Sequence, residues 1–396
     1  MPRNMKTRTV LLCVTGSIAA FKAVEIAREL SRRGVVVKVA MTEAANEFIA
    51  PLTFEALLGS PVATGLFSGE CGPIPHISLA ESCDAMLVAP ATADAIAKLV
   101  YGFGDDIVSS TALACAAPLI VAPAMHENMW LHPATQANIE ILKSRGAVVV
   151  GPERGDLASG GKGSGRMADP SVIVGVALGV LGKSGDLAGR KVVVTAGGTQ
   201  EPIDPVRCVT NRSSGKMGYA VAEAARDRGA EVILISAPTA VSRPAGVSVV
   251  RVTTAAEMLD ATRTAVEGAD ALIMAAAVAD YRPAHPEADK IKKDRAEMTI
   301  PLERTVDILG SLHGDYVRVG FAAESSNLER NAQTKLTEKQ LHFIVGNDIT
   351  AEDSGFGSDT NRVTIMDRDG TVERLPVLSK REVADRILDR VVPLLT

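Results

Sequence analysis

One run of small, polar and basic residues carries the clearest chemical signal in this chain. Residues 211–218 read Asn-Arg-Ser-Ser-Gly-Lys-Met-Gly and lie between a strand-like segment at 192–199 and a helical pattern that begins near Tyr219. Glycines and small hydroxyl side chains let backbone N–H groups approach an anion, and a helix N-terminus adds its positive dipole. A Lys-Ile-Lys-Lys run at 290–293 supplies further positive charge. The pattern predicts a site for several phosphates, and hence an enzyme that handles nucleotides.

Three turns in the first half also follow strand-like segments and carry polar side chains. Gly16 and Ser17 follow the segment 9–14, Pro-Ala-Thr-Ala-Asp occupies 90–94, and Pro-Ala-Met-His-Glu-Asn-Met-Trp occupies 123–130. In a doubly wound sheet, ligands bind outside the carboxyl ends of the strands, so we expect these turns to form one crevice. For the first turn taken alone, an ordinary strand-to-helix connection with Ser17 as the helix N-cap is the simpler interpretation.

The elements that must position these residues alternate along the chain. Apolar runs of strand length alternate with helical periodicity, which is typical of βαβ units and a mainly parallel sheet. In the first half we expect strands at 9–14, 35–40, 85–89, 119–122 and 147–150, helices at 17–33 and 171–182, and a glycine-rich loop at 151–165. In the second half we expect strands at 191–195, 231–236, 248–252, 270–275, 316–320 and 343–345, and helices at 216–228, 255–267, 327–341 and 380–394.

Residues 183–189 have the composition of a linker, and the βαβ pattern restarts after them. The sequence therefore predicts two separate α/β domains, at 1–182 and 190–396. No extended self-similarity relates the two halves, so we do not interpret them as a repeat.

Composition excludes several classes of function. No uninterrupted apolar run among the 396 residues is long enough to span a bilayer, and no cleavage site follows the first apolar segment. The five cysteines lack paired spacing, which disfavours a structural zinc site or a disulfide framework and fits a reducing cytoplasm. A formal charge of −5 and an aromatic content of 3% disfavour a nucleic-acid partner.

Longer motifs in each half resemble known families. Residues 16–20, the His-Ile-Ser-Leu run at 76–79, and the turns at 90–110 and 123–130 resemble the flavin-dependent cysteine decarboxylases, which have a flavodoxin-like fold. The runs at 196–207, 210–218, 275–283, 290–293 and 320–324 are similar to phosphopantothenate–cysteine ligase, whose domain is Rossmann-like. In this order the two halves resemble the bifunctional bacterial proteins of coenzyme A biosynthesis. The resemblance covers nearly the whole chain.

The resemblance implies an FMN pocket in the first half. Its residues would be Gly16, Ser17, Ile18, Thr42, Thr92, Ala93, Asp94 and Ala124. His76 falls on the family's active-site histidine, and an imidazole titrates near neutral pH, so it can accept a proton from a thiol or orient it. Alone, a histidine before an apolar strand is more often structural. As the resemblance implies, flavin withdraws electrons from the cysteine-derived thiol, and the resulting thioaldehyde permits decarboxylation.

Two departures from the family pattern affect this half. Where the family has an asparagine that binds the substrate carboxylate, this chain has His126, whose imidazole can also donate a hydrogen bond. Where many relatives carry a cysteine that delivers the final proton, this chain has Ser159, and a hydroxyl is far less acidic than a thiol. We expect another group or water to donate that proton. Cys71 is a candidate, although a passive thiol is the simpler interpretation.

The resemblance also implies a CTP site in the second half. Lys290 would contact nucleotide phosphate, Asn211 would position the substrate and the acyl intermediate, and Arg207 lies nearby in the same loop as a substrate ligand. The implied nucleotide-binding set is Met274, Ala275, Ala276, Asp280, Lys290, Thr305, Val306, Asp307, Ile308, Phe321, Lys335 and Lys339. Relatives have Asn-Pro-Asp-Ile where residues 305–308 read Thr-Val-Asp-Ile. Taken alone, the lysines would be interpreted as a solvated face. Magnesium is expected through the phosphates, with no protein ligand assigned.

The leading hypothesis is a cytoplasmic enzyme that ligates phosphopantothenate to cysteine with CTP and then decarboxylates the product to phosphopantetheine. An active ligase with a silent or regulatory flavin domain is the alternative, because Ser159 stands where many relatives have the cysteine that delivers the final proton. An NAD-linked dehydrogenase is disfavoured because neither glycine-rich turn reads Gly-x-Gly-x-x-Gly with an acidic residue at the expected distance. The resemblance further implies a homo-oligomer, with flavin domains forming trimers within a dodecamer and ligase domains forming dimers.

Overall fold

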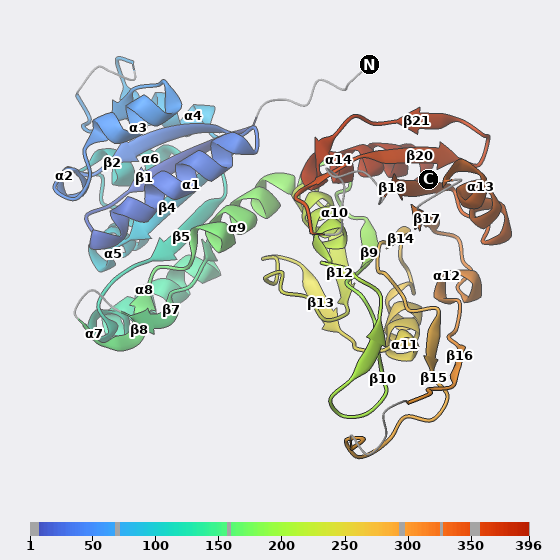
Figure 1. Ribbon diagram of the computed structural model, residues 1–396. Coiled ribbons are helices and arrows are strands. Elements are labelled where there is room, and N and C mark those ends of the chain that lie inside the picture. Colours follow the sequence, from blue (N-terminus) through green and yellow to red (C-terminus); the bar gives the residue numbers. More distant parts are fainter. Residues whose placement is uncertain are drawn as a thin grey trace. The chain divides into compact units, whose positions relative to one another are not determined.

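The structure, a computed structural model, describes residues 8–67, 72–156, 160–292, 298–324, 328–348 and 357–395. The chain divides into two compact units, Met1–Leu181 and Gly182–Thr396. Each unit is an α/β structure with its own sheet (Figure 1). The two units are described separately below.

The sheet of the first unit is wholly parallel and has six strands in the order β3-β2-β1-β4-β5-β6. Its strands are β1 (Thr9–Val14), β2 (Val36–Met41), β3 (Val62–Ala63), β4 (Ala85–Ala91), β5 (Leu119–Pro123) and β6 (Val148–Val149). Because β1 pairs with β2 on one side and β4 on the other, the chain reverses its direction of travel across the sheet between β1 and β4. Such a switch point leaves a crevice at the carboxyl ends of the two strands.

Helices cover both faces of this sheet (Figure 1). They are α1 (Phe21–Arg32), α2 (Glu43–Asn46), α3 (Pro51–Leu58), α4 (Pro75–Ser82), α5 (Ala93–Tyr101), α6 (Ile107–Ala114), α7 (Glu127–Trp130), α8 (Pro133–Ser144) and α9 (Pro170–Gly182), with the short 3-10 helix η1 (Ile18–Ala20). Alternate residues of β1 face opposite sides, since Leu12 packs with α1 and α9 whereas Leu11 packs with α5, α6 and α8.

Two sequence predictions for this unit were wrong. His76 does not precede a strand but lies in the first turn of α4, where Pro75 is well suited to a helix start because its missing N–H would have no partner there. The predicted loop at 151–165 contains an antiparallel hairpin, β7 (Glu153–Asp156) with β8 (Lys162–Arg166). Glycines in β8 hide the strand pattern because they leave no side chain to alternate.

The main sheet of the second unit has eight strands in the order β13-β12-β9-β14-β17-β18-β20-β21. These are β9 (Lys191–Ala196), β12 (Glu231–Ser236), β13 (Ser248–Arg251), β14 (Ala271–Met274), β17 (Val317–Glu324), β18 (Phe343–Asp348), β20 (Val363–Asp367) and β21 (Val372–Arg374). The six strands from β13 to β18 are parallel, whereas β20 and β21 add an antiparallel edge that the sequence did not predict. The switch point lies between β9 and β14.

Smaller elements complete this unit. Two-stranded ladders join β10 (Gln200–Pro202) with β11 (Cys208–Thr210), β15 (Tyr281–Pro283) with β16 (Leu302–Arg304), and β19 (Thr360–Asn361) with β22 (Leu378–Ser379). The helices are α10 (Lys216–Asp227), α11 (Ala255–Ala265), α12 (Ile308–Ser311), α13 (Leu328–Glu338) and α14 (Lys380–Val391), followed by the 3-10 helix η3 (Val392–Leu394). Helices α10 and α14 pack on one face of the sheet, and α11, α12 and α13 on the other.

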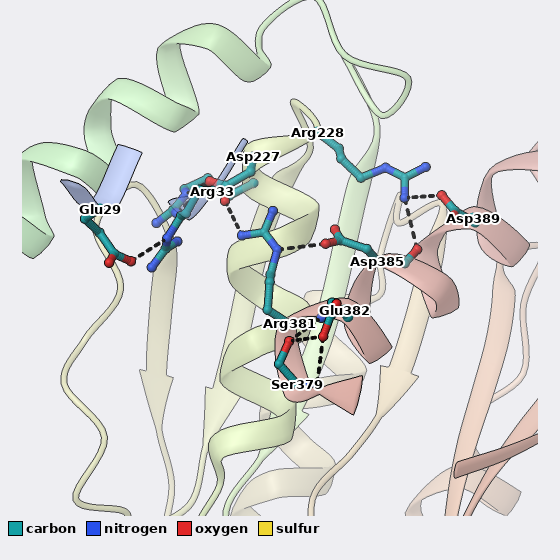
Figure 2. A network of polar contacts seen from close by, with 10 residues as sticks. Glu29, Arg33, Asp227, Arg228, Ser379, Arg381, Glu382, Asp385 and Asp389 are labelled. Carbon is teal, nitrogen blue, oxygen red and sulfur yellow. Dashed lines mark hydrogen bonds and ion pairs between the residues drawn. The ribbon is translucent and has the colours of Figure 1, made fainter. Parts of the chain in front are cut away.

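A charged network joins the ends of α10 and α14 (Figure 2). Arg381 of α14 binds Asp227 at the end of α10 and also Asp385 one turn along its own helix. Arg228 binds Asp389 of α14 at 2.8 Å. Asp227 is nearly buried, with 5% of its side chain exposed, so the bond from Arg381 compensates a charge that is largely shielded from water.

The segment at 183–189 is fastened to the second unit. Leu187 is fully buried and its N–H donates to the Arg228 carbonyl, while the carboxylate of Asp186 pairs with the Arg228 guanidinium at 2.6 Å. Gly185 has no room for a side chain because a Cβ would lie 2.1 Å from the Arg228 carbonyl oxygen. A segment with linker composition is thus ordered by contacts with the end of α10.

Candidate functional site

The crevice of the first unit begins at the ends of β1 and β4. Thr15 is buried there, and its Oγ1 donates to the Pro90 carbonyl at 2.7 Å and accepts the N–H of Thr92 at 3.2 Å. Ser17 caps η1 by accepting the N–H of Ala19, and Thr92 caps α5 by accepting the N–H of Ala95. Both turns therefore end in a helix N-terminus at the same edge of the sheet, where an anion is stabilised.

All the residues implied for the FMN pocket lie along this carboxyl edge. Gly16, Ser17 and Ile18 follow β1, Thr42 follows β2, Thr92, Ala93 and Asp94 follow β4, and Ala124 follows β5. Gly16 must be glycine because a Cβ would lie 2.5 Å from the Ala44 Cβ. Asp94 points its carboxylate toward Lys98, 3.6 Å away, and stays largely exposed.

Orphaned polar atoms are an independent sign of a ligand in this unit. Within the described residues, Thr42 Oγ1, Asn46 Oδ1 and His76 Nδ1 are buried and have no hydrogen-bond partner. Buried polar groups are almost always paired, so such atoms call for a bound group or water. Thr42 and His76 were both predicted to be site residues; Asn46 was not, because an asparagine in a helical pattern carries no distinctive signal.

The turn after β5 holds His126 in a defined orientation. His126 is the N-cap of α7, and its Nδ1 accepts the N–H of Asn128 at 3.2 Å. A neutral ring that accepts at Nδ1 carries its proton at Nε2. The exposed Nε2–H of His126 is then a donor, as a ligand for a carboxylate requires.

Helix α7 also anchors the β7–β8 hairpin. The N–H of Ser164 donates to the Glu127 carboxylate at 2.8 Å, and the N–H of Met125 donates to the Gly165 carbonyl at 3.0 Å. A Cβ on Gly163 would lie 2.8 Å from the Glu127 carboxylate, and one on Gly165 would lie 2.2 Å from the Met125 carbonyl oxygen. The hairpin therefore lies directly against the turn that carries His126. Ser159 and Cys71 lie outside the described residues.

A large cleft of about 1000 Å³ occupies the switch point of the second unit. It is lined by every predicted nucleotide-binding residue except Lys290, namely Met274, Ala275, Ala276, Asp280, Thr305, Val306, Asp307, Ile308, Phe321, Lys335 and Lys339. Asn211 lines it as well, together with the following residues up to Gly218 at the start of α10. Segments distant in sequence thus meet in one cavity.

Threonine hydroxyls hold the floor of this cleft in place. Thr195 Oγ1 accepts the N–H of Ala276 at 3.1 Å, and Thr199 Oγ1 accepts the N–H of Ala279 at 2.9 Å. The Nδ2 of Asn211 donates to the Val278 carbonyl at 2.9 Å, which fixes the side chain against the same strand end. The Oδ1 atom of Asn211 takes no part in this bond, so it can accept a hydrogen bond from a substrate.

Asp307 and Lys339 form a pair at one wall of the cleft. Lys339 Nζ lies 3.0 Å from Asp307 Oδ1, which also accepts the N–H of Gly310 as the N-cap of α12. Burial raises the pKa of Asp307, but the bonds from Gly310 and Lys339 outweigh it and hold the pKa below its usual range. Thr305 is fixed to the segment that follows β14, since its Oγ1 donates to the Ala279 carbonyl and its N–H to the Asp280 carbonyl.

Lys290 and Arg207 do not line the cleft. Arg207 Nη2 donates to the Ile291 carbonyl at 2.7 Å and lies 3.1 Å from Asp204 Oδ2, which also accepts the N–H of Ile291. Asp204 is buried, and burial raises its pKa; three backbone N–H groups and Arg207 outweigh this and hold the pKa below its usual range. Arg207, predicted to be a substrate ligand, thus supports the turn that carries Lys290.

Comparisons with known proteins match both units. The Flavoprotein family model matches residues 1–182, and the model of the DNA/pantothenate metabolism flavoprotein C-terminal domain matches residues 187–394. The coenzyme A biosynthesis bifunctional protein CoaBC of Bacillus subtilis (strain 168) is 45% identical over 398 residues, which cover 98% of each chain. The chain belongs to this family of bifunctional coenzyme A biosynthesis proteins. It is therefore a phosphopantothenoylcysteine decarboxylase and a phosphopantothenate–cysteine ligase.

Two further comparisons give similar sequence identities. The CoaBC protein of Escherichia coli (strain K12) is 42% identical, again over 98% of each chain. A crystal structure of the C-terminal domain of a CoaBC protein is 45% identical, covers 54% of this chain and 98% of that one, and has a TM-score of 0.46.

Two lysines of the cleft were not predicted as site residues. Lys216, in the first turn of α10, lies 2.6 Å from Asp359 and bonds the Gly357 carbonyl, and Lys380 of α14 bonds the Ser358 carbonyl. Lys216 sits within the run 211–218 and could have been singled out from it. Lys380 carries no local signal, because its place in the cleft follows from the packing of α14 on α10.

Proposed function

We propose that the first unit binds flavin mononucleotide across the carboxyl ends of β1, β2, β4 and β5. The match of residues 1–182 to the Flavoprotein model supports this. So do the helix N-termini after β1 and β4, which suit a phosphate, and the orphaned Thr42 Oγ1 and His76 Nδ1, which suit a polar ring system. When bound, the flavin would accept electrons from the substrate thiol and return them after decarboxylation.

The two histidines would act on the substrate from different elements. His126 would donate from Nε2 to the substrate carboxylate, since its Nδ1 is engaged with the backbone. His76 would accept the proton of the substrate thiol or orient that thiol, because an imidazole is suited to both near neutral pH. The β7–β8 hairpin, held by Glu127 beside His126, would restrict water at this end of the site.

In the second unit, we propose that the cleft binds CTP and the phosphopantothenate carboxylate together. The carboxylate attacks the α-phosphorus and pyrophosphate leaves; the cysteine amine then displaces CMP from the acyl carbon. Residues 274–276 would present backbone groups to the base, Lys335 and Lys339 would neutralise phosphate charge in the cleft, and Asn211 would hold the carboxylate in line. Lys290 lies outside the cleft lining and would contact the phosphates once the nucleotide is bound. The observation that carries the proposal is that segments from seven places in the sequence line one cleft.

Magnesium would enter with the nucleotide rather than occupy a protein cage. Among the described residues, no group of three or more histidine, cysteine or acidic side chains has the arrangement to hold a metal ion. Mg²⁺ commonly binds through substrate phosphates and retains several waters. The preference for cytosine rests on membership of the family.

We further propose that the protein works in the cytoplasm as a homo-oligomer with trimeric flavin units and dimeric ligase units. In the part of the chain that the structure describes, no helix has the length and apolarity needed to cross a membrane. Exposed side chains of the first unit, Phe21, Leu52 and Phe67, are suited to contacts between copies.

Both activities can be tested in one experiment. Purified flavin-loaded protein receives phosphopantothenate, cysteine, CTP and magnesium, and pyrophosphate and carbon dioxide are followed together. We expect both, with phosphopantetheine as product. Pyrophosphate without carbon dioxide would instead favour an active ligase with a silent flavin unit, the alternative motivated by Ser159 in place of a cysteine. Replacing CTP with ATP tests the base preference.

A further inference from the structure

Two cysteines of the first unit lie against each other away from the crevice. Cys83 is the C-cap of α4 and Cys115 the C-cap of α6, and their sulfur atoms are 3.5 Å apart. Both thiols also face one acceptor, the Ala80 carbonyl, at 3.5 Å and 3.9 Å. None of these atoms belongs to the sites proposed above.

We propose that Cys83 and Cys115 form a reversible disulfide when the protein meets a peroxide. Both side chains are only partly buried, so a small oxidant can reach them. Both residues follow the last turn of a helix and have extended backbone, and the Cys115 N–H still donates to the Ala112 carbonyl at 3.4 Å. A disulfide needs a sulfur–sulfur distance of about 2 Å, so the two sulfur atoms must approach each other by about 1.5 Å.

The pair is chemically asymmetric. The hydrogen bond between the sulfurs lowers the pKa of Cys115 against the effect of burial, and the backbone of Ala117 lowers it further. The same hydrogen bond and burial raise the pKa of Cys83. Since the thiolate is the nucleophile, Cys115 is the residue that reacts first with peroxide.

The reaction balances without any further reagent. The Cys115 thiolate attacks one peroxide oxygen, the O–O bond breaks, and the products are a sulfenic acid on Cys115 and, after protonation, water. The Cys83 sulfur then attacks the Cys115 sulfur and the S–O bond breaks. The Cys83 proton leaves with the hydroxide as a second water. Two thiols lose two electrons, and one peroxide becomes two waters.

The other described cysteines provide controls. Cys13 is fully buried, and burial raises its pKa well above the usual range, so it should stay inert. Cys208 is exposed in β11 of the second unit, so it tests exposure alone. Among the described residues, neither has an interaction with a second sulfur like that between Cys83 and Cys115.

The test treats the full-length, flavin-loaded protein with hydrogen peroxide and maps disulfides by mass spectrometry of non-reduced peptides. We expect one dominant intrachain link between the peptides of Cys83 and Cys115, removed by dithiothreitol. Cys83→Ser keeps a hydrogen-bond donor but cannot close the link, so dimedone should label Cys115. Cys115→Ser should leave Cys83 unlabelled, and Cys208→Ser should not alter the link.

Two results would overturn the proposal. One is a Cys83–Cys115 link that forms no faster than links involving Cys208. The other is equal dimedone labelling of Cys83 in Cys115→Ser and of Cys115 in Cys83→Ser, because the asymmetry would then be absent. Circular dichroism of each variant confirms that the thiols are compared in folded protein.

Discussion

Thr15 connects the two strands at the switch point of the first unit, since its hydroxyl donates to the Pro90 carbonyl at 2.7 Å and accepts the N–H of Thr92 at 3.2 Å. The strands diverge at a switch point, so backbone N–H and C=O groups at the strand ends lose their hydrogen-bond partners in the sheet. A short side chain that can both donate and accept, such as threonine, can bind these groups instead. In the second unit, Thr195 lies near the end of the first strand, β9, and its Oγ1 accepts the N–H of Ala276. Both proposed ligand sites thus rest on a buried threonine at the end of their first strand.

Replacing Thr15 with valine should weaken flavin binding. The change keeps the shape but leaves the Pro90 carbonyl and the Thr92 N–H without a partner, which costs about 1–3 kcal/mol for each buried group. We expect the dissociation constant for FMN to rise about tenfold, measured by quenching of flavin fluorescence. Thr15→Ser keeps both bonds and should bind FMN nearly as the natural protein does. Equal binding by the two variants would mean that the hydroxyl does not position this turn.

The glycines of β8 should be essential for decarboxylation but not for ligation. Gly165 has φ +138°, and an alanine Cβ there would meet the Met125 carbonyl oxygen at 2.2 Å, so Gly165→Ala must move the hairpin away from His126. We expect decarboxylation to fall by at least about tenfold, since backbone strain of this kind costs about 1–3 kcal/mol before any clash is counted. Ligation, measured as pyrophosphate release, should not change.

Gly161 is the matched control for this experiment because a Cβ there would meet no atom within 4 Å. Gly161→Ala should retain decarboxylation. Glu127→Gln should also retain most of it, because the amide oxygen can still accept the N–H of Ser164, whereas Glu127→Ala should not. If Gly161→Ala and Gly165→Ala were equally active, the contact between β8 and the Met125 turn would have no role in the reaction.

Periodicity predicted the parallel parts of both sheets because buried strands and amphipathic helices leave strong local signals. The expected strand at 9–14 agrees with β1, and that at 231–236 with β12. The β7–β8 hairpin was missed because glycines at 163 and 165 remove the alternation of side chains. A side chain at Gly163 would meet the Glu127 carboxylate, and one at Gly165 would meet the Met125 carbonyl oxygen. The close approach of β8 to residues 125–127 therefore requires glycines, and these remove the side-chain alternation by which a strand is recognised in the sequence.

The candidate sites also contain residues whose position could be predicted from the sequence and residues whose contacts could not. The placement of residues at strand ends, such as Thr92 and Ala276, was predictable because the carboxyl ends of parallel strands lie at one edge of the sheet. The bond from Arg207 to the Ile291 carbonyl was not predictable, since it joins segments more than eighty residues apart. Asp204, which organises that contact, was missed because an acidic residue in a Pro-rich turn usually has a local role.

Removing Arg381 should destabilise the second unit alone. Its guanidinium compensates the nearly buried Asp227, which retains Arg226 at 2.6 Å as a second partner. Breaking a buried pair costs about 3–5 kcal/mol, and the partial exposure of Arg381 and the remaining partner reduce this to about 2 kcal/mol for Arg381→Met. Ligation should be lost on heating about 4–8 °C earlier, and decarboxylation at an unchanged temperature.

Arg263 gives the control for this prediction. It forms a comparable ion pair with Asp260 on α11, but both side chains are more than half exposed. Arg263→Met should change stability by no more than about 0.5 kcal/mol. Equal effects at Arg263 and Arg381 would mean that burial of Asp227 is not what makes its pair important.

Asp204→Asn should impair ligation by releasing the turn that carries Lys290. Asp204 Oδ1 accepts the N–H groups of Val206 and Arg207, which an amide oxygen can still do. Oδ2, however, accepts the N–H of Ile291. In the variant an amide NH₂ takes the place of Oδ2, and because it is a donor it cannot accept the N–H of Ile291. We expect the KM for CTP to rise about tenfold with decarboxylation unchanged, since loss of one charge-assisted bond at a buried site typically has an effect of this order.

The pH dependence follows from the lowered pKa of Asp204. A depressed carboxyl pKa contributes stability that is fully present above the unfolded-state value of about 3.9 and is lost only as pH falls below it, through the folded value. Asp204 should therefore stay ionised from about pH 7 to pH 5, and its titration should not change the KM for CTP over that range. Asp260→Asn, at an exposed pair, should match the natural protein. An unchanged KM in Asp204→Asn would mean that Lys290 is positioned without the Asp204 carboxylate.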